Sequence, residues 1–380
     1  MARLLKYFVV LLLLASMTYA VIIFNRSPVV VGFAGPLTGP YSDLGVNGRN
    51  GVRLAVEEIN DRGGIDGRKM ELLVRNDKGL CDEAAQATAE LIDSGAQAII
   101  GHMTSEQTIS ALPVAAEKDV VLLSPTTSTP ELSGIKDNFF RIHPSTDRDA
   151  IALARYVLQE KGVDSLCTLK DMDNEAYAGS FEKYFVQEFK SGGGEVAHRQ
   201  KLYASCSPDW FQVAEDLKSC TDEAVLLALS ARDAANLVQA LESIDYSPEI
   251  FSTGWAMTRE LLRAGGRTVE NVTFVTSTFK EKPGPDFQEF AKSYRSRFGS
   301  EPSFAAAFAY DAAHVLARAL EKSFDGSGLE QALTEIRGYP GLYWPITIDE
   351  YGDVMSPIYI VQVAEGEFEA VQGFDTQELE

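Results

Sequence analysis

The sequence predicts an α/β protein made of two similar units, each a parallel sheet with helices packed on it. Three observations predict this fold class. Short apolar runs without alternating polar residues recur along the chain, as in strands that are buried on both faces. Segments with apolar residues at helical spacing separate these runs. The pattern restarts near residue 147, and 380 residues exceed what one ordinary core holds, so we expect two units.

The first series of strands and helices covers about residues 28–130. Val52, Ala55, Val56 and Ile59 fall at i, i+3, i+4 and i+7 and predict one face of the first helix. Further helices are expected at residues 81–94 and from about residue 105 to 118. The predicted strands are residues 28–34, 70–74, 98–100 and 120–123. This βαβαβαβ order implies a parallel sheet with right-handed crossovers.

The second series begins after the stretch "IHPSTDRD", where Asp147 and Asp149 lead into a helix over residues 150–159. Its strands are predicted at residues 164–169, 196–203, 224–229, 249–252 and 274–276. Helices between them end near residues 189, 218 and 244. Two more amphipathic helices, at residues 286–298 and 304–322, precede short strands at residues 346–348 and 358–363. The two series are alike in architecture and show no visible sequence repeat.

Hydroxylated residues follow two neighbouring strands of the first series. They are Thr104 and Ser105 after the strand 98–100, and Ser124, Thr126, Thr127 and Ser128 after the strand 120–123. Ligands of parallel sheets bind beyond the carboxyl ends of the strands, where both clusters fall. Thr104 or Ser105 is placed to cap a helix, whose first amides suit a carboxylate or another anion. The alternative is that one cluster is only a cap and the other only a polar turn.

The composition excludes some classes of partner. The chain has 34 basic and 55 acidic residues, a formal net charge of −21. This balance argues against nucleic acid and against an anionic membrane surface as partners. A hydrophobic content of 45% with 23% charged residues is typical of globular proteins.

The N-terminus predicts export. Arg3 and Lys6 precede about 18 apolar or weakly polar residues, 7–24, which as a helix would span roughly 27 Å of a hydrocarbon core of about 30 Å. We therefore expect an extracytoplasmic protein, with residues 1–24 as a signal peptide or an N-terminal anchor. Thr18-Tyr19-Ala20 fits a cleavage site, but the apolar run continues to Phe24, so both alternatives stay open.

Cysteine and histidine spacing predicts neither a disulfide scaffold nor a metal site. Four cysteines are few for 380 residues. Cys206 and Cys220 flank a predicted helix whose ends would lie about 18 Å apart, too far for a bridge. The sequence contains no CxxC or HxxxH pair, and its four histidines are scattered, so we expect no metal and no cofactor.

Six stretches together resemble a known family. They are "GPLTGPYSDLG", "GVRLAVEEINDRGGIDGRKMELLVRND", "IIGHMTSEQT", "LLSPTTSTPEL", "FFRIHPSTDRD" and "AAFAYDAAHVLARAL", which span most of residues 29–363. In this order and at these separations the chain resembles the branched-chain amino-acid binding proteins of ABC importers, which are type I periplasmic binding proteins. The resemblance implies two Rossmann-like lobes that are joined by three crossovers, with a ligand cleft between them. It places one lobe at residues 29–144 plus 277–346 and the other at residues 145–276 plus 347–380.

The resemblance also implies a function. A monomer of this family captures a small carboxylated or polar metabolite by hinged closure of the lobes and delivers it to a membrane permease, without catalysis. The implied ligand-binding residues in the N-terminal lobe are Ser105, Thr126, Thr127, Ser128 and the apolar Met103, Phe304 and Tyr310. In the second lobe they are Tyr177, Ser230 and Trp255. Helical periodicity alone favours core positions for Phe304 and Tyr310, and Trp255 could simply pack between the lobes.

Two departures from the family pattern bear on the ligand. Amino-acid-binding members carry an acidic residue after the strand 249–252, and this residue pairs with the ammonium of the ligand. This chain has "STGWAMT" there, without a carboxylate. A buried ammonium without an anion costs several kcal/mol, so either Asp233 or Asp173 reaches the site or the ligand lacks an amine. Cys81 matches one half of a family disulfide whose other position is Thr104 here, so that bridge is absent.

Two other classes of function remain as alternatives. A protein of the same fold could be a ligand-sensing receptor module that signals through a partner protein. An enzyme is the third possibility, but the sequence contains no GxSxG, P-loop, GxGxxG or zinc-ligand spacing.

Overall fold

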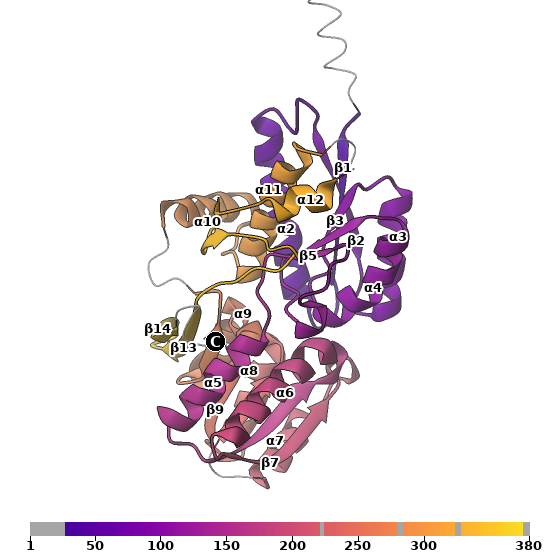
Figure 1. The fold of residues 1–380 in the computed structure, drawn as a ribbon. Coiled ribbons are helices and arrows are strands. Elements are labelled where there is room, and N and C mark those ends of the chain that lie inside the picture. Colours follow the sequence, from indigo (N-terminus) through magenta and orange to yellow (C-terminus); the bar gives the residue numbers. More distant parts are fainter. Residues whose placement is uncertain (1–26, 221–223, 280–283, 324–327, 375–380) are drawn as a thin grey trace, which may run out of the picture.

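The chain folds into two lobes that lie one above the other in Figure 1. The computed structural model describes residues 27–220, 224–279, 284–323 and 328–374. Lobe 1 is built on a five-stranded sheet with the order β2-β1-β3-β4-β5, and lobe 2 on a seven-stranded sheet with the order β14-β13-β10-β9-β8-β6-β7. This arrangement confirms the predicted α/β fold class with two Rossmann-like lobes.

All neighbouring strands of the lobe 1 sheet run parallel. Its strands are β1 (Val29–Gly35), β2 (Met70–Asn76), β3 (Ala98–Ile100), β4 (Val121–Ser124) and β5 (Phe139–Arg141). Its helices are α2 (Ser42–Asp61), α3 (Cys81–Asp93), α4 (Ser105–Glu117), α10 (Pro285–Phe298), α11 (Phe304–Leu320) and α12 (Leu329–Thr334). A small antiparallel pair, β11 (Tyr339–Pro340) and β12 (Pro345–Ile346), follows α12.

The lobe 2 sheet is parallel except at one edge, where β13 and β14 run antiparallel to their neighbours. Its strands are β6 (Ser165–Asp171), β7 (Glu195–Leu202), β8 (Ala224–Ala228), β9 (Glu249–Thr253), β10 (Thr273–Thr276), β13 (Ile358–Ala364) and β14 (Glu367–Phe374). Its helices are α5 (Asp147–Gln159), α6 (Glu175–Ser191), α7 (Trp210–Lys218), α8 (Ala231–Ser243) and α9 (Arg259–Gly265).

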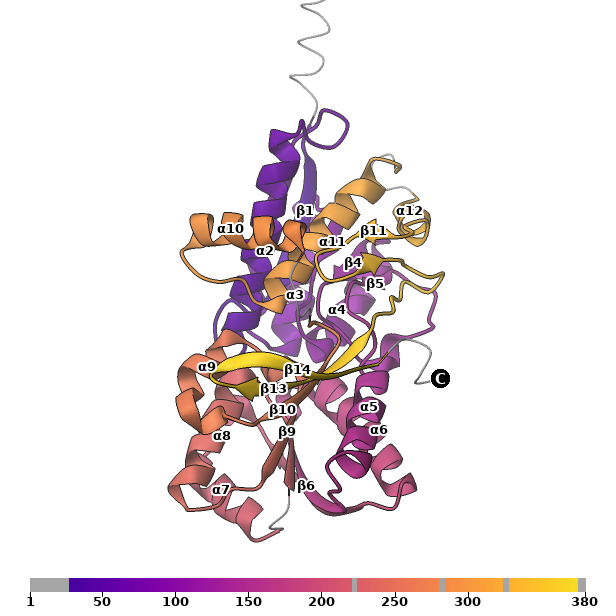
Figure 2. The same cartoon turned by 90° about the vertical axis from the view of Figure 1, so that its left-hand side faces the viewer.

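Each sheet has an apolar core on both faces, as its uninterrupted apolar strands require. In lobe 1, Phe33 and Leu123 pack with helices α2 and α11, while Ile99 and Leu122 pack with α3 and α4. In lobe 2, one face packs against α7, α8 and α9 and the other against α5 and α6. The carboxyl ends of both parallel sheets face the junction between the lobes, which is the position that the fold provides for a ligand. Figure 2 shows the β13–β14 hairpin close to this junction.

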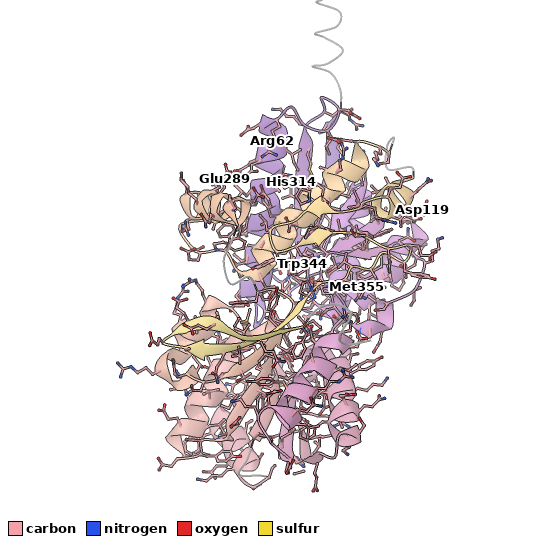
Figure 3. All side chains as sticks on the ribbon, turned by 60° about the vertical axis from the view of Figure 1, so that its left-hand side comes forward. Arg62, Asp119, Glu289, His314, Trp344 and Met355 are labelled. Atoms are coloured by element: carbon pink, nitrogen blue, oxygen red, sulfur yellow. The ribbon has the colours of Figure 1, made fainter. Side chains whose placement is uncertain are left out.

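The chain passes between the lobes three times, after β5, after β10 and between β12 and β13. The end of β5 and the third crossover are joined by an ion pair, with Arg141 Nη2 2.7 Å from Asp353 Oδ1. Met355 lies on the third crossover near the junction of the lobes (Figure 3). Ile348 and Val354 of the same segment still pack in the lobe 1 core. The residue boundaries drawn from the resemblance stay a prediction.

Several elements were not expected from the sequence. The strands β5 and β14 and the short helices α9 and α12 are the main additions. The proposed signal peptide or anchor, residues 1–24, lies outside the described residues. Among the helices that the structure describes, none combines the length and the apolar character needed to cross a membrane.

Candidate functional site

A small cavity lies between the lobes. Its walls come from both lobes and from two crossovers. Lobe 1 provides Leu44, Met103, Thr104, Ser105, Thr126, Ser128 and Phe304, the first and second crossovers provide His143 and Thr278, and lobe 2 provides Asp149, Asn174, Tyr177, Gly254, Trp255 and Thr276. The structure therefore brings together seven of the ten predicted site residues: Met103, Ser105, Thr126, Ser128, Tyr177, Trp255 and Phe304.

The two hydroxyl clusters meet on the lobe 1 wall because β3 and β4 are neighbours in the sheet. Ser105 Oγ accepts hydrogen bonds from the backbone amides of Ser128 and Thr129, both at 3.3 Å. Thr126 Oγ1 donates to the carbonyl oxygen of Met103 at 2.5 Å. The expected side-chain cap of α4 is not made, because the Thr104 hydroxyl bonds to the side chain of Gln107 instead. The first amides of α4 nevertheless begin at this wall.

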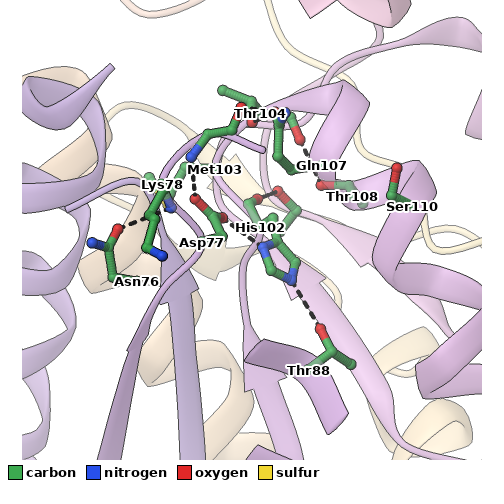
Figure 4. Close-up of polar contacts among 12 residues, drawn as sticks. Asn76, Asp77, Lys78, Thr88, His102, Met103, Thr104, Gln107, Thr108 and Ser110 are labelled. Carbon is green, nitrogen blue, oxygen red and sulfur yellow. Dashed lines mark hydrogen bonds and ion pairs between the residues drawn. The ribbon is translucent and has the colours of Figure 1, made fainter. Parts of the chain in front are cut away.

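A buried network supports the loop that carries these residues (Figure 4). The ring of His102 lies between Asp77 and Thr88, with Nδ1 2.6 Å from Asp77 Oδ2 and Nε2 2.9 Å from Thr88 Oγ1. All three side chains are fully buried. Ser124 Oγ donates to the carbonyl oxygen of His102 at 2.6 Å. The network thus fixes the end of β3 immediately before Met103.

Aromatic side chains form the lobe 2 wall. The rings of Tyr177 and Trp255 meet edge to face with centroids 5.6 Å apart, and Tyr41 of lobe 1 packs on Trp255 at 5.3 Å. Burial raises the pKa of Tyr177, so its hydroxyl stays protonated and can donate or accept. An amphipathic tyrosine beside an indole suits the less polar part of a small ligand.

Among the described residues of the cavity wall, Asp149 is the one carboxylate, and sequence reasoning assigned it no role in the site. Asp173 and Asp233, which sequence reasoning did consider, do not line the cavity. It lies in the first turn of α5 with 6% of its surface exposed, and its Oδ1 has no hydrogen-bond partner among the described residues. Burial, and to a lesser extent the charge of Asp147, raises the pKa of Asp149 to about 8. In the sequence it looked like an ordinary acidic residue at the start of a helix, where such side chains are usually solvated.

Three predicted residues lie outside this cavity. The hydroxyl of Thr127 is buried behind the wall, 2.6 Å from Thr108 Oγ1. Ser230 caps α8, because its Oγ donates to Asp233 Oδ2 at 2.8 Å and accepts from the Asp233 amide at 3.4 Å. Tyr310 faces α2, where its hydroxyl donates to Glu58 Oε2 at 2.6 Å. The rotation along α11 explains the last difference, since six residues after Phe304 a helical side chain points to another side.

Polar contacts join the two lobes beside the cavity. The hydroxyl of Tyr41 donates to Asp171 Oδ2 at 2.6 Å. Helix α4 of lobe 1 meets the start of α6 in lobe 2, where the Ala176 amide donates to Glu106 Oε2 at 2.8 Å and the Glu106 amide donates to Asn174 Oδ1 at 3.3 Å. These hydrogen bonds connect lobe 1 to lobe 2 next to the cavity.

None of the four cysteines lines the cavity. All four cysteines are free thiols. Within residues 27–374, leaving out the three short gaps, no group of three or more His, Cys, Asp or Glu side chains is arranged to hold a metal ion. The described residues of the cavity wall supply hydroxyls, amides, aromatic rings, the imidazole of His143 and the carboxylate of Asp149.

Comparison with known proteins identifies the family. A family model described as periplasmic binding protein matches residues 28–367. Leu/Ile/Val-binding protein homolog 1 of Brucella suis biovar 1 (strain 1330) is 24% identical over 369 residues, which cover 93% of this chain and 96% of that protein. Two crystal structures from this fold are similar. One is the leucine binding protein LivK from Thermotoga maritima MSB8 (24% identity, TM-score 0.82, covering 92% of this chain and 99% of that one).

The other is a solute binding protein of an ABC transporter from Rhodopseudomonas palustris BisB5 in complex with 3,4-dihydroxy benzoic acid (23% identity, TM-score 0.81, covering 92% of this chain and 97% of that one). These likenesses agree with the two-lobed fold described above. The match over most of the chain confirms the resemblance drawn from the sequence: the chain belongs to the periplasmic binding protein family.

Proposed function

We propose that the chain is the solute-binding protein of an ABC importer and that it captures a small carboxylated or polar metabolite between its lobes. Membership of the periplasmic binding protein family implies an extracytoplasmic location. The observation that carries the proposal is the cavity between the lobes, with hydroxyls and helix-start amides on one wall and aromatic rings on the other. In this role the protein acts as a monomer, passes its ligand to a membrane permease and performs no catalysis.

The chemistry of the lobe 1 wall favours a ligand with a carboxylate. The hydroxyls of Ser105, Thr126 and Ser128 lie beside the start of α4, where the helix dipole favours an anion. Names of similar proteins point the same way, since one refers to leucine and another to 3,4-dihydroxy benzoic acid, both of which are carboxylic acids. We therefore place the anionic end of the ligand at this wall.

Hinged closure follows from the way the lobes are connected. A ligand that contacts both walls at once stabilises the arrangement in which the walls face each other. The bonds from Tyr41 and Glu106 to lobe 2 require the same arrangement. The permease would then recognise the closed lobes and not the open ones.

Substitution of Ser105 tests the proposed function. Ser105→Ala removes a hydroxyl from the lobe 1 wall, where we place the carboxylate of the ligand. Because a hydrogen bond to a charged group contributes about 1.5–3 kcal/mol, we expect affinity for carboxylic acids to fall about 10- to 100-fold. The measurement is a thermal-shift screen of amino acids, aromatic acids and short aliphatic acids, followed by calorimetry of the acids that bind. A binder at 100 times its dissociation constant raises stability by about 2.7 kcal/mol.

Ser110→Ala is the matched control, because Ser110 lies on the same helix outside the cavity and donates to the Glu106 carbonyl oxygen. It should bind as the wild-type protein does. The proposed site is wrong if no acid in the screen stabilises the wild-type protein. It is also wrong if Ser105→Ala and Ser110→Ala bind these acids with equal affinity.

A further inference from the structure

Two of the four cysteines lie close together in the core of lobe 2, on the face of the sheet that α7, α8 and α9 cover. Cys167 lies in the first half of β6 and is fully buried. Cys220 comes just after α7, which ends at Lys218, and packs half-buried against the apolar cluster that contains Cys167. Of the other two, Cys81 lies in lobe 1 and the exposed Cys206 lies before the opposite end of α7.

The pairing of β6 with β8 explains why these two cysteines meet. In this parallel pair Cys167 stands opposite Val225, near the start of β8. The chain reaches β8 from the end of α7, so Cys220 precedes Val225 by only a few residues. Ala214 and Leu217 of α7 pack in the same cluster as Cys167. The end of α7 therefore lies over the part of β6 that carries Cys167.

The two thiol groups are in direct contact. They share a hydrogen bond, and Cys220 Sγ also donates to the carbonyl oxygen of Asp216 at 3.2 Å. Burial raises the pKa of the Cys167 thiol to about 12, and the contact with Cys220 adds to this shift. The remaining step to a disulfide is the approach of the two sulfur atoms to about 2 Å.

We propose that Cys167 and Cys220 form a disulfide in the exported protein. Disulfides form and persist outside the cytoplasm, and membership of the periplasmic binding protein family implies that location. The bond joins an inner strand of the lobe 2 sheet to the end of a helix that covers it. Neither cysteine lines the ligand cavity, so the proposal goes beyond the proposed function and does not depend on the ligand.

The bond forms by thiol–disulfide exchange with a disulfide oxidant, such as oxidised glutathione or the disulfide of an oxidoreductase. Because Cys220 reaches solvent and Cys167 does not, the Cys220 thiolate attacks the oxidant first and displaces one of its sulfurs as a thiolate. Cys167 then loses its proton, and its sulfur attacks the Cys220 sulfur of the mixed disulfide and displaces the second thiolate. The two cysteines lose two electrons and two protons, and the oxidant gains them as two thiols.

A disulfide at this position should stabilise lobe 2. It closes a loop of about 50 residues that includes β7 and α7, and it thereby restricts the unfolded chain. We expect the oxidised protein to melt about 5–10 °C above the reduced protein. Ligand affinity should not change, because the bond lies outside the cavity wall.

Differential alkylation of the full chain tests the proposal. The protein is exported by a bacterial host, purified without a reductant and unfolded in iodoacetamide, and its disulfides are then reduced and labelled with N-ethylmaleimide. Mass spectrometry should find the maleimide on Cys167 and Cys220 and the acetamide group on Cys81 and Cys206. A digest without reductant should contain the peptides of Cys167 and Cys220 as one linked species. This measurement uses the wild-type protein and does not depend on any variant folding.

Cys220→Ser and Cys206→Ser form a matched pair of variants, because the two cysteines flank the same helix. Each protein is reduced, treated with oxidised glutathione, and its thermal unfolding is compared before and after the treatment. The wild-type protein and Cys206→Ser should gain the expected 5–10 °C. Cys220→Ser should gain nothing.

The inference is overturned if Cys167 and Cys220 of the exported protein carry the acetamide group, since their contact is then only the packing of two free thiols in a core. It is also overturned if either cysteine is linked to Cys81 or Cys206, or if Cys220→Ser gains as much stability on oxidation as the wild-type protein. None of these results bears on the proposed function, which the acid screen tests separately.

Discussion

Asp311 shows how one buried side chain makes stability depend on pH. It lies on α11 with 3% of its surface exposed, and its Oδ2 accepts a hydrogen bond from the Leu342 amide at 2.9 Å. Burial raises the pKa of Asp311 to about 8, whereas an unfolded aspartate has a pKa of about 3.9. Between these values the folded state holds a proton that the unfolded state has lost. This contribution to the free energy of unfolding is therefore full below pH 4 and is lost as the pH rises to about 8.

We predict that Asp311→Asn makes stability less dependent on pH. The asparagine retains an acceptor for the Leu342 amide but has no proton to lose. From pH 7 to pH 8 the wild-type protein should lose about 1 kcal/mol more than the variant. Urea unfolding at pH 7, 8 and 9 measures this difference. Burial lowers the pKa of His143 and of His314 to about 4, but both proteins carry these histidines, so their contribution cancels in the comparison.

Asp93→Asn serves as the control, since Asp93 is exposed at the end of α3. It should follow the wild-type pH dependence. Parallel pH curves for Asp311→Asn and the wild-type protein would contradict the prediction.

Helix packing in lobe 1 depends on a close approach between α2 and α11. A Cβ atom added at Gly51 would lie 2.1 Å from the carbonyl oxygen of Ala306. The alanine-rich sequence of α11 presents small side chains to α2, so the two backbones come near each other. In Figure 3, Arg62 near the end of α2 and His314 of α11 lie on the same part of lobe 1. This contact holds the C-terminal helices against the N-terminal half of the chain.

We predict that Gly51→Ala destabilises the protein although alanine is the better helix former. The intrinsic gain is about 1 kcal/mol, but a backbone oxygen must move by an ångström or more, and overpacking of a core typically costs about 1–3 kcal/mol or more. The matched control is Gly179→Ala on α6, where the added Cβ meets only the flexible side chain of Glu175 at 2.6 Å. That variant should be neutral or stabilised. Thermal unfolding of both variants decides between the two effects, and equal melting temperatures would contradict the packing argument.

If the lobes close on a ligand as proposed, their relation to each other contributes to ligand affinity as well as the cavity does. Glu106 and Tyr41 contact lobe 2 without lining the cavity. Tyr41 donates to Asp171, whose pKa burial raises to about 6. In the proposed mechanism, contacts of this kind stabilise the closed arrangement relative to an open one and so add to the apparent affinity for any ligand.

We predict that Glu106→Ala weakens binding without touching the cavity. It removes the acceptor of the Ala176 amide at the start of α6 and with it about 1–1.5 kcal/mol of closure, so affinity should fall about 5- to 10-fold for every acid that binds. Glu117→Ala at the exposed far end of α4, where Glu117 lies 3.6 Å from Lys118, should have no effect. Calorimetry with each ligand found in the acid screen measures the change, and equal affinities of the two variants would contradict the role of Glu106 in closure.

Most of the α/β alternation was predictable because it depends on local pattern. Helical spacing around Val52 and the apolar run from Ile99 depend only on which residues follow one another. The meeting of Ser105 and Ser128 was also predictable, because carboxyl ends of neighbouring parallel strands share one edge of a sheet. β14 was missed because apolar and polar residues alternate only at its start. Its burial alternates regularly, but Val371 takes an exposed position and Gln372 a half-buried one.

The remaining features depend on packing between segments that are distant in the sequence. Phe304 and Tyr310 belong to one helix, and only the position of that helix against α2 and the cleft decides which of them faces the cavity. Asp149 is the clearest case. Its sequence context shows an acidic residue in a first helical turn, a place where water normally solvates it. Helix α6 and the crossovers pack around Asp149 and exclude that water. Because ionisation of a buried carboxylate without a partner costs free energy, the tertiary environment of Asp149, and not its sequence context, makes it a candidate site residue.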